Sequence, residues 1–357
     1  MTPQMAGANV NPMEKMVLDE RKKAILRVVV HDYILTAEPV SSKAVAEKCR
    51  LGVSPATVRH ELGILEDMGY LKQPHTSAGR IPSDLGYRFY VDALAEVRLN
   101  PVERATIDRI FASVSKEIED LMRETSVLLS RMTRHTGIVF APALKKSAFK
   151  HIDLVFLRPD TILMVLITET GCVEKQVLEF KSEVSAEDLA AVESILNRHL
   201  ARLDIDEIKT KRAELLKHSV NCKNLIREVW GKIIDRMDRE ENERIFLGGT
   251  FHFLRQPEFE SVKRVQDILE ALERRYVLLR LLGDTFSQSQ VVVKIGSENQ
   301  QSEIKDCSFV AANYQFGGKN LGTLGILGPT RMDYAHVISM VKYFAQTLSE
   351  VLESLHQ

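Results

Sequence analysis

Hydrophobic positions along the chain change from helical to strand spacing and back, and these changes divide the sequence into blocks. Residues 1–17 show no periodic pattern, so we expect a flexible leader there. The pattern from Leu18 to about Leu94 predicts short helices around a turn-rich stretch, and residues 102–135 predict one long helix. β-branched and aliphatic clusters between turn signals then predict strands at Gly137–Ala141, Ile152–Leu157, Thr161–Thr168 and Val173–Phe180.

A helical block interrupts these strands. Ser185 begins it with a capping-box-like sequence, because an acid follows three residues later, and charge-rich helical spacing continues to about Phe246. Gly248 and Gly249 break this pattern, and a helix is predicted at about 262–282. The later elements are strands at Val291–Ile295, Phe309–Tyr314 and Leu321–Leu327 and a final amphipathic helix at Asp333–Leu355. The economical interpretation is one α/β domain with a helical insertion, and two separate small domains are the alternative.

The first 70 residues contain a helix-turn-helix pattern. Helices are predicted at about Leu18–Leu35 and after Pro39, where Ser41 or Ser42 supplies the cap. The dipeptide Ser54-Pro55 specifies the start of a third helix, because Ser is a good N-cap and Pro is favoured at the first helical position. A short turn that contains Gly52 joins the second and third helices, which is typical of this motif.

The third helix has an apolar stripe and a polar face. At 100° per residue, Val58, Leu62 and Leu65 fall on one side, and small or polar residues lie opposite and beside them. A hairpin predicted over 70–82 completes a winged helix-turn-helix. We expect the helix to meet base edges, where Arg59 can pair with guanine, and the wing to meet phosphates. The residues predicted to contact DNA are Lys43, Ser54, Ala56, Thr57, Arg59, His60, Lys72, His75, Thr76, Ser77 and Arg80.

Charge supports this interpretation only modestly. Residues 19–96 hold eleven basic and eleven acidic side chains, and residues 41–82 hold six and four. The whole chain carries 48 Lys and Arg against 49 Asp and Glu, so DNA binding has to use a local patch and two domains acting together. A winged helix that makes protein contacts is the alternative.

Composition and motif spacing exclude several other classes. The hydrophobic fraction of 45% and the charged fraction of 27% are typical of a globular protein. The four cysteines are too far apart in sequence for a zinc or thioredoxin motif. The longest aliphatic run, Ile162–Ile167, is too short to cross a membrane, and no signal peptide is apparent. We therefore expect a soluble cytoplasmic protein with no membrane partner, no metal, no cofactor and no catalytic site.

Several motifs resemble those of the bacterial heat-inducible transcription repressor family HrcA. The residues that carry the resemblance are Tyr33-Ile34, Glu38–Lys43, Ser54–Arg59, Leu65-Glu66, Gly69–Leu71, the highly specific run Gln73–Pro82, Gly86–Arg88, Tyr90–Asp92 and, more weakly, Leu321-Gly322 and Gly328–Tyr334. The family usually has Asn where this chain has His60.

The resemblance implies a dimeric repressor that binds an inverted repeat, the CIRCE element, ahead of chaperone operons, and that the chaperonin GroEL keeps active. It also implies an α+β multidomain architecture. The parts are a winged helix at 18–98, a GAF-like domain at 102–183 and 261–357, and a helical dimerisation insert at 184–260. A dimer also has a physical reason, because two recognition helices about one DNA turn apart read both halves of an inverted repeat.

The predicted insert carries an apolar helical stripe of Leu189, Val192, Ile195 and Leu196. This stripe is either the dimer seam or local core. A second functional hypothesis is a ligand-responsive regulator of another regulon, in which residues such as Phe156, Met164 and Phe309 line a pocket rather than fill the core. A third, an enzyme with an accessory winged helix, requires a nucleophile or metal site that the sequence does not offer.

Overall fold

The computed structural model divides the chain into two compact units, Met1–Ala95 and Glu96–Gln357. The residues that the structure describes are 18–49, 52–75, 78–93, 99–113, 117–141, 147–211, 222–238, 245–259, 261–274, 277–278, 291–299 and 301–355. The predicted leader at 1–17 lies outside them. Helices and sheets occur in both units, so the α+β prediction is confirmed at that level.

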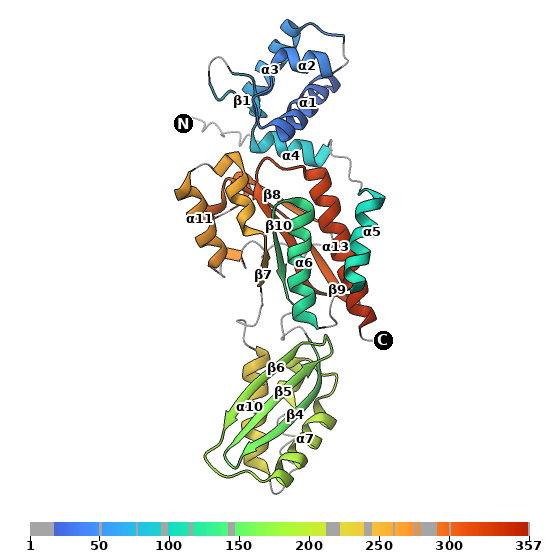
Figure 1. Cartoon of the computed structure of the whole chain (residues 1–357), viewed down its shortest axis with the longest axis vertical. Coiled ribbons are helices and arrows are strands. Elements are labelled where there is room, and N and C mark those ends of the chain that lie inside the picture. The colour runs from blue at the N-terminus through green and yellow to red at the C-terminus, as the bar shows by residue number, and fades with distance from the viewer. Residues whose placement is uncertain are drawn as a thin grey trace, which may run out of the picture. The chain divides into compact units, whose positions relative to one another are not determined.

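The first unit contains the three predicted helices, a short hairpin and a fourth helix (Figure 1). Its elements are α1 (Glu20–Thr36), α2 (Ser42–Lys48), α3 (Pro55–Asp67), β1 (Leu71–Lys72), β2 (Ile81–Pro82) and α4 (Asp84–Ala93). Asp19, Ser41 and Ser54 cap the first three helices, and each side chain accepts a hydrogen bond from the backbone N–H three residues ahead. The caps at Ser41 and Ser54 confirm the predicted starts of the second and third helices.

The second unit is built on a five-stranded antiparallel sheet with the strand order β7-β3-β10-β9-β8. Its strands are β3 (Thr136–Phe140), β7 (Ile245–Gly248), β8 (Val292–Ile295), β9 (Cys307–Phe316) and β10 (Lys319–Pro329). A tight turn joins β9 to β10 at Gly317 and Gly318, which have φ of +57° and +75°. These values lie in the left-handed region that favours glycine, so the sequence fixes the hairpin here.

Helices cover both faces of this sheet. Ile138 and Phe140 share a hydrophobic core with Val265 of α11 (Val262–Glu273). A Cβ at Gly137 would instead meet the Ser126 carbonyl of α6 (Ile118–Thr133), so α6 lies on the opposite face. α13 (Tyr334–Ser354) contacts both α6 and α5 (Pro101–Ser113). The predicted single helix at 102–135 is therefore two helices, α5 and α6.

A separate three-stranded antiparallel sheet, in the order β4-β5-β6, has its own helices (Figure 1). The elements are β4 (Phe149–Arg158), β5 (Thr161–Thr168), β6 (Val173–Glu179), α7 (Ala186–Leu200), α8 (Ile205–Thr210) and α10 (Lys223–Asp238). One hydrophobic core joins them, in which Met164 from β5 packs with Val192 from α7 and Ile233 from α10. The Ser185 hydroxyl caps α7 as predicted, since it accepts the Asp188 amide.

This second core changes the predicted domain boundaries. From the sequence, residues 102–183 are predicted to share a domain with the later strands at 261–357, and the insert is predicted at 184–260. In the structure, β4–β6 form their own sheet and core with the following helices, so the inserted unit begins before β4. Ile245–Gly248 is not the end of a helix but a strand that pairs with β3, so the insert ends before β7 rather than at residue 260.

The remaining short elements precede α11 and β9. They are the 3-10 helices η3 (Thr250–Arg255), η4 (Pro257–Phe259), η5 (Gly296–Glu298) and η6 (Ser302–Ile304). The predicted helix at 262–282 is observed as α11 up to Glu273, and most of its second half lies outside the described residues. Among the helices that the structure describes, none is long and apolar enough to cross a membrane.

Candidate nucleic-acid interface

α3 presents the face that the sequence predicts. Its apolar stripe, Val58, Leu62 and Leu65, is buried in the first unit. The residues that remain accessible are Ser54, Ala56, Arg59 and His60, which are exposed, and Thr57, which is half-buried. The predicted recognition face of the helix is therefore open at its N-terminal end, where such helices meet base edges.

A buried acidic side chain, Glu61, joins α3 to α1. Glu61 is 7% exposed, and its carboxylate lies 3.2 Å from Lys22 Nζ and 3.5 Å from an Arg21 guanidinium nitrogen. At 100° per residue, Glu61 falls beside the apolar stripe, which is the signal that places it near the buried side. Two cations at the start of α1 therefore pair with α3, of which Lys22 is largely buried and Arg21 is half exposed.

The hairpin is attached to the helices through its second strand. Leu71 pairs with Pro82, and Lys72 with Ile81. The Arg80 and Val40 backbones exchange two hydrogen bonds of 2.9 Å, N–H to C=O in both directions. A Cβ at Gly79 would lie 2.3 Å from the Val40 carbonyl oxygen, so only glycine permits this approach. The base of the hairpin is thus fixed to the connection between α1 and α2.

Arg80 is predicted to be a phosphate ligand at the wing, but in the structure it pairs with a carboxylate. Its Nη2 atom lies 2.7 Å from Glu66 Oε2, and its side chain is only 18% exposed. The ion pair links the hairpin to the last turn of α3. Sequence reasoning missed it because the two residues lie far apart in the chain, and a cation beside a turn gives no indication of its partner.

Three of the predicted cations are accessible. Lys43, Arg59 and Lys72 are exposed, and none has an ion-pair partner within the described part of the chain. His75 is also exposed, whereas Thr76 and Ser77 lie outside the described residues. These three cations come from α2, α3 and β1, so they can meet a polyanion from three elements of the first unit.

The predicted dimerisation stripe lies in the core. Leu189 is 3% exposed, and Val192 and Leu196 are fully buried in the cluster that joins α7 to β4–β6. Ile195 is partly buried against the same cluster. Residues that already fill the interior of one chain cannot form the seam with a second chain, so the local-core interpretation is the correct one.

The other side of the same sheet is partly exposed in the described part of the chain. Side chains alternate along β5, so Ile162, Met164 and Leu166 face the helices and the residues between them face away. We name this side the open face; its apolar residues are Val155, Leu163, Val165, Ile167, Val173 and Val177. Val155, Val173 and Val177 are 45%, 41% and 55% exposed. The register also places His151, Asp153 and Lys175 on this face, so its exposed apolar residues are interspersed with polar ones.

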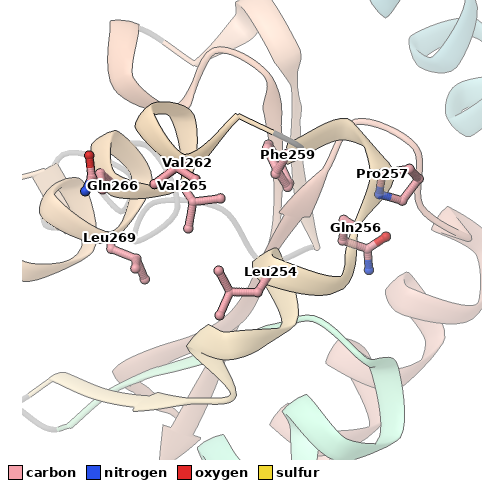
Figure 2. A pocket seen from close by; sticks show the side chains of 8 residues that line it. All are labelled: Leu254, Gln256, Pro257, Phe259, Val262, Val265, Gln266 and Leu269. Atoms are coloured by element: carbon pink, nitrogen blue, oxygen red, sulfur yellow. The ribbon is translucent and has the colours of Figure 1, made fainter.

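An apolar groove of about 610 Å³ lies between η3, η4 and α11 (Figure 2). Leu254 extends toward Val265 and Leu269 of α11, and Gln256 and Pro257 lie toward the other end. The predicted pocket residues do not meet here or elsewhere. Met164 and Phe309 are buried in two different cores, and Phe156 is 42% exposed on β4.

In the described part of the chain, no group of three metal-ligating side chains is found. His135 is buried beside Gly328, and burial lowers its pKa to about 4, so the imidazole is neutral at physiological pH. Burial raises the pKa of Cys172 and of Cys307, the latter to about 12. These thiols are therefore protonated and poor nucleophiles.

Comparison with known proteins identifies the family. The sequence model of the HrcA protein C-terminal domain matches residues 119–338. "Heat-inducible transcription repressor HrcA" of Desulforamulus reducens is 39% identical over 95% of this chain and 99% of its own length. The chain belongs to the HrcA family. The HrcA proteins of Pelotomaculum thermopropionicum and Carboxydothermus hydrogenoformans are 39% and 40% identical, again over nearly their whole lengths.

Membership of the HrcA family confirms the resemblance seen in the motifs of the first unit. HrcA proteins are named as transcription repressors, so the enzyme hypothesis is set aside. A crystal structure titled as a hypothetical protein covers 95% of this chain and 100% of that chain with a TM-score of 0.61. It is 24% identical, and it supports the fold alone.

Proposed function

We propose that this HrcA-family protein represses chaperone operons by binding the CIRCE inverted repeat as a homodimer, and that the chaperonin GroEL keeps it active. The observation that carries the proposal is the accessible face of α3, whose opposite side is packed in the first unit. The first unit is the winged helix-turn-helix in this proposal, with α3 as the recognition helix and β1–β2 as the base of the wing.

The arrangement of charge supports DNA as the ligand. Lys43, Arg59 and Lys72 provide accessible cations without ion-pair partners among the described residues, while Arg21, Lys22 and Arg80 each pair with a carboxylate of α3. Only a few phosphate contacts are then available from each chain, so a single copy binds DNA weakly. Affinity and specificity therefore depend on two copies that engage both halves of the repeat.

The open face supports a homodimer. Val155, Leu163 and Val177 lie side by side across the three strands and expose apolar surface. A face that is repeated in a second copy can pair with itself about a two-fold axis, which also matches the symmetry of an inverted repeat. We propose that the dimer forms through this face, within the inserted unit, and that the five-stranded unit is the GAF-like domain.

The named relatives support control by heat, since each is called a heat-inducible transcription repressor. In the proposed mechanism, GroEL maintains the DNA-binding form of the repressor. Heat-damaged proteins then occupy the chaperonin, the repressor loses its active form, and chaperone genes are expressed.

Fluorescence anisotropy with the full-length protein tests this function. A duplex with the intact CIRCE repeat is compared with a duplex of the same composition and scrambled sequence, with and without GroEL. We expect tighter binding to the intact repeat and a larger active fraction when GroEL is present. Equal affinity for both duplexes with GroEL present, from protein shown to be folded, contradicts the proposal.

The groove of Figure 2 favours a second candidate function, a regulator that responds to a small ligand. Its volume and its apolar lining with two glutamines, Gln256 and Gln266, are typical of small-molecule sites. Thermal-shift screening with metabolites tests this candidate. A ligand that raises the melting temperature of the wild type but not of Leu254→Gln supports it, and no shift from any compound counts against it.

A further inference from the structure

A polar groove of about 400 Å³ lies in the first unit between α2, α3 and the hairpin. The residues of its lining that bear on its chemistry are Ser41, Ser42, Arg59, Gln73, Gly79 and Arg80. No carboxylate belongs to the lining among the described residues, although the first unit as a whole holds twelve basic and eleven acidic side chains. The groove is therefore a local site for an anion inside a unit that is close to neutral.

The two guanidinium groups reach the groove from different elements. Arg59 belongs to the exposed side of α3 and has no ion-pair partner among the described residues. Arg80 comes from the hairpin, where Glu66 holds its Nη2 atom at 2.7 Å from outside the lining. Arg80 Nε is buried and makes no hydrogen bond within the described residues. A buried N–H without a partner is costly, and this one belongs to a side chain that lines the groove.

Serine hydroxyl groups provide further donors at the start of α2. The Ser41 oxygen accepts the Ala44 amide at 3.2 Å, which leaves its own O–H to donate. Ser42, the next residue, also lines the groove. Hydroxyl and guanidinium donors around a small concave site match the oxygens of a phosphate group.

We propose that this groove holds one backbone phosphate of the bound DNA and that Arg59 is a ligand of this phosphate rather than a reader of a base. The inference rests on the proposed DNA binding and makes it more specific. Arg59 and the start of α2 then position the duplex, Glu66 positions Arg80 at the wall of the groove, and sequence is read by other residues on the exposed face of α3.

Two substitutions at Ser42 that introduce side chains of the same shape test the site. Asp and Asn have the same size, and both suit the start of a helix, so Ser42→Asp and Ser42→Asn differ only in charge. Full-length protein is titrated with intact and scrambled CIRCE duplexes over a range of salt concentrations. We expect Ser42→Asp to bind both duplexes at least about tenfold more weakly than Ser42→Asn, because its carboxylate repels the phosphate.

Arg59→Ala separates the two roles of that side chain. A phosphate ligand contributes equally to every sequence, so both duplexes should lose the same factor in affinity. The slope of log K against log salt should also fall by about one. Loss confined to the intact repeat, with an unchanged slope, overturns the assignment of Arg59, and equal binding by Ser42→Asp and Ser42→Asn overturns the site.

The same titration distinguishes the site from the wider function. If the wild type binds both duplexes with equal affinity, operator recognition fails. The phosphate site is still tested by comparing the affinities of Ser42→Asp and Ser42→Asn for either duplex. If the wild type binds neither duplex with GroEL present, both proposals are wrong.

Discussion

Removal of either partner of the Glu66–Arg80 ion pair is expected to loosen the base of the hairpin. The pair joins the end of α3 to Arg80, and the Arg80 backbone exchanges two 2.9 Å hydrogen bonds with Val40. One residue therefore connects the hairpin both to α3 and to the start of α2. Glu66→Gln or Arg80→Gln keeps much of the side-chain volume and removes the charge attraction.

The exposure of the two side chains sets the size of the effect. Exposed ion pairs contribute about 0–1 kcal/mol, and loss of one partner from a buried pair costs about 3–5 kcal/mol. Arg80 and Glu66 are 18% and 32% exposed, so this pair lies between the two limits. We expect each variant to lower the free energy of local opening by about 1–2 kcal/mol. Opening then becomes about 5–30-fold more frequent, because about 1.4 kcal/mol corresponds to a factor of ten.

Amide hydrogen exchange of residues 78–82 in the full-length protein measures this opening, because the Arg80 N–H is bonded to Val40. The double variant should lower the free energy of local opening by less than the sum of the two single variants, as expected for coupled partners. Asp67→Asn, one residue away on α3, is the matched control and should leave exchange unchanged. Unchanged exchange in both single variants, or an equal increase in the control, would refute the reasoning.

Burial and packing lead to three further expectations, for two glycines, for His135 and for the open face. Gly79→Ala forces a Cβ to within 2.3 Å of a backbone carbonyl oxygen and should reduce DNA binding, as measured by fluorescence anisotropy. A Cβ at Gly63 meets nothing within 4 Å, so Gly63→Ala should raise the melting temperature in thermal unfolding. Burial lowers the pKa of His135 to about 4, so the unfolded chain binds a proton below pH 6.5 that the folded chain does not. Unfolding free energy should fall by about 3 kcal/mol between pH 6.5 and 4, and His135→Gln should flatten this dependence in denaturant titrations. Val177→Asp should weaken the dimer at least about tenfold in analytical ultracentrifugation, because it places a charge on the open face, while Leu254→Asp, at another exposed apolar site, should not.

Local signals predict much of the first unit. Ser54 and Pro55 specify the start of α3, and the spacing of Val58, Leu62 and Leu65 identifies its buried side, since both depend only on neighbours in sequence. The exposed positions of Arg59 and the neighbouring residues follow from the same periodicity. The accessible part of the candidate site was therefore predictable, although its function in DNA binding remains a prediction.

Partners that lie far apart in sequence were not predictable. Hydrophobic periodicity reports that Leu189 and Val192 are buried on one side, but not whether a neighbouring strand or a second chain covers them. Strand patterns likewise do not say which sheet a strand joins. For this reason the sequence predicts β4–β6 in one domain with the later strands, whereas they form their own sheet. The Glu66–Arg80 ion pair was not predictable for the same reason, because ion pairs between distant parts of the chain produce no periodic sequence pattern.

The most direct measurement of the central claim is the affinity of the full-length protein for three duplexes in the presence of GroEL. The duplexes carry the intact CIRCE repeat, the repeat with one half scrambled, and the repeat with both halves scrambled. The account predicts the tightest binding to the intact repeat, with two chains per duplex. Affinity should fall at least about tenfold when one half is lost, because mismatched base pairs cost about 1–3 kcal/mol each. Equal affinity for all three duplexes would contradict sequence-specific binding by a dimer.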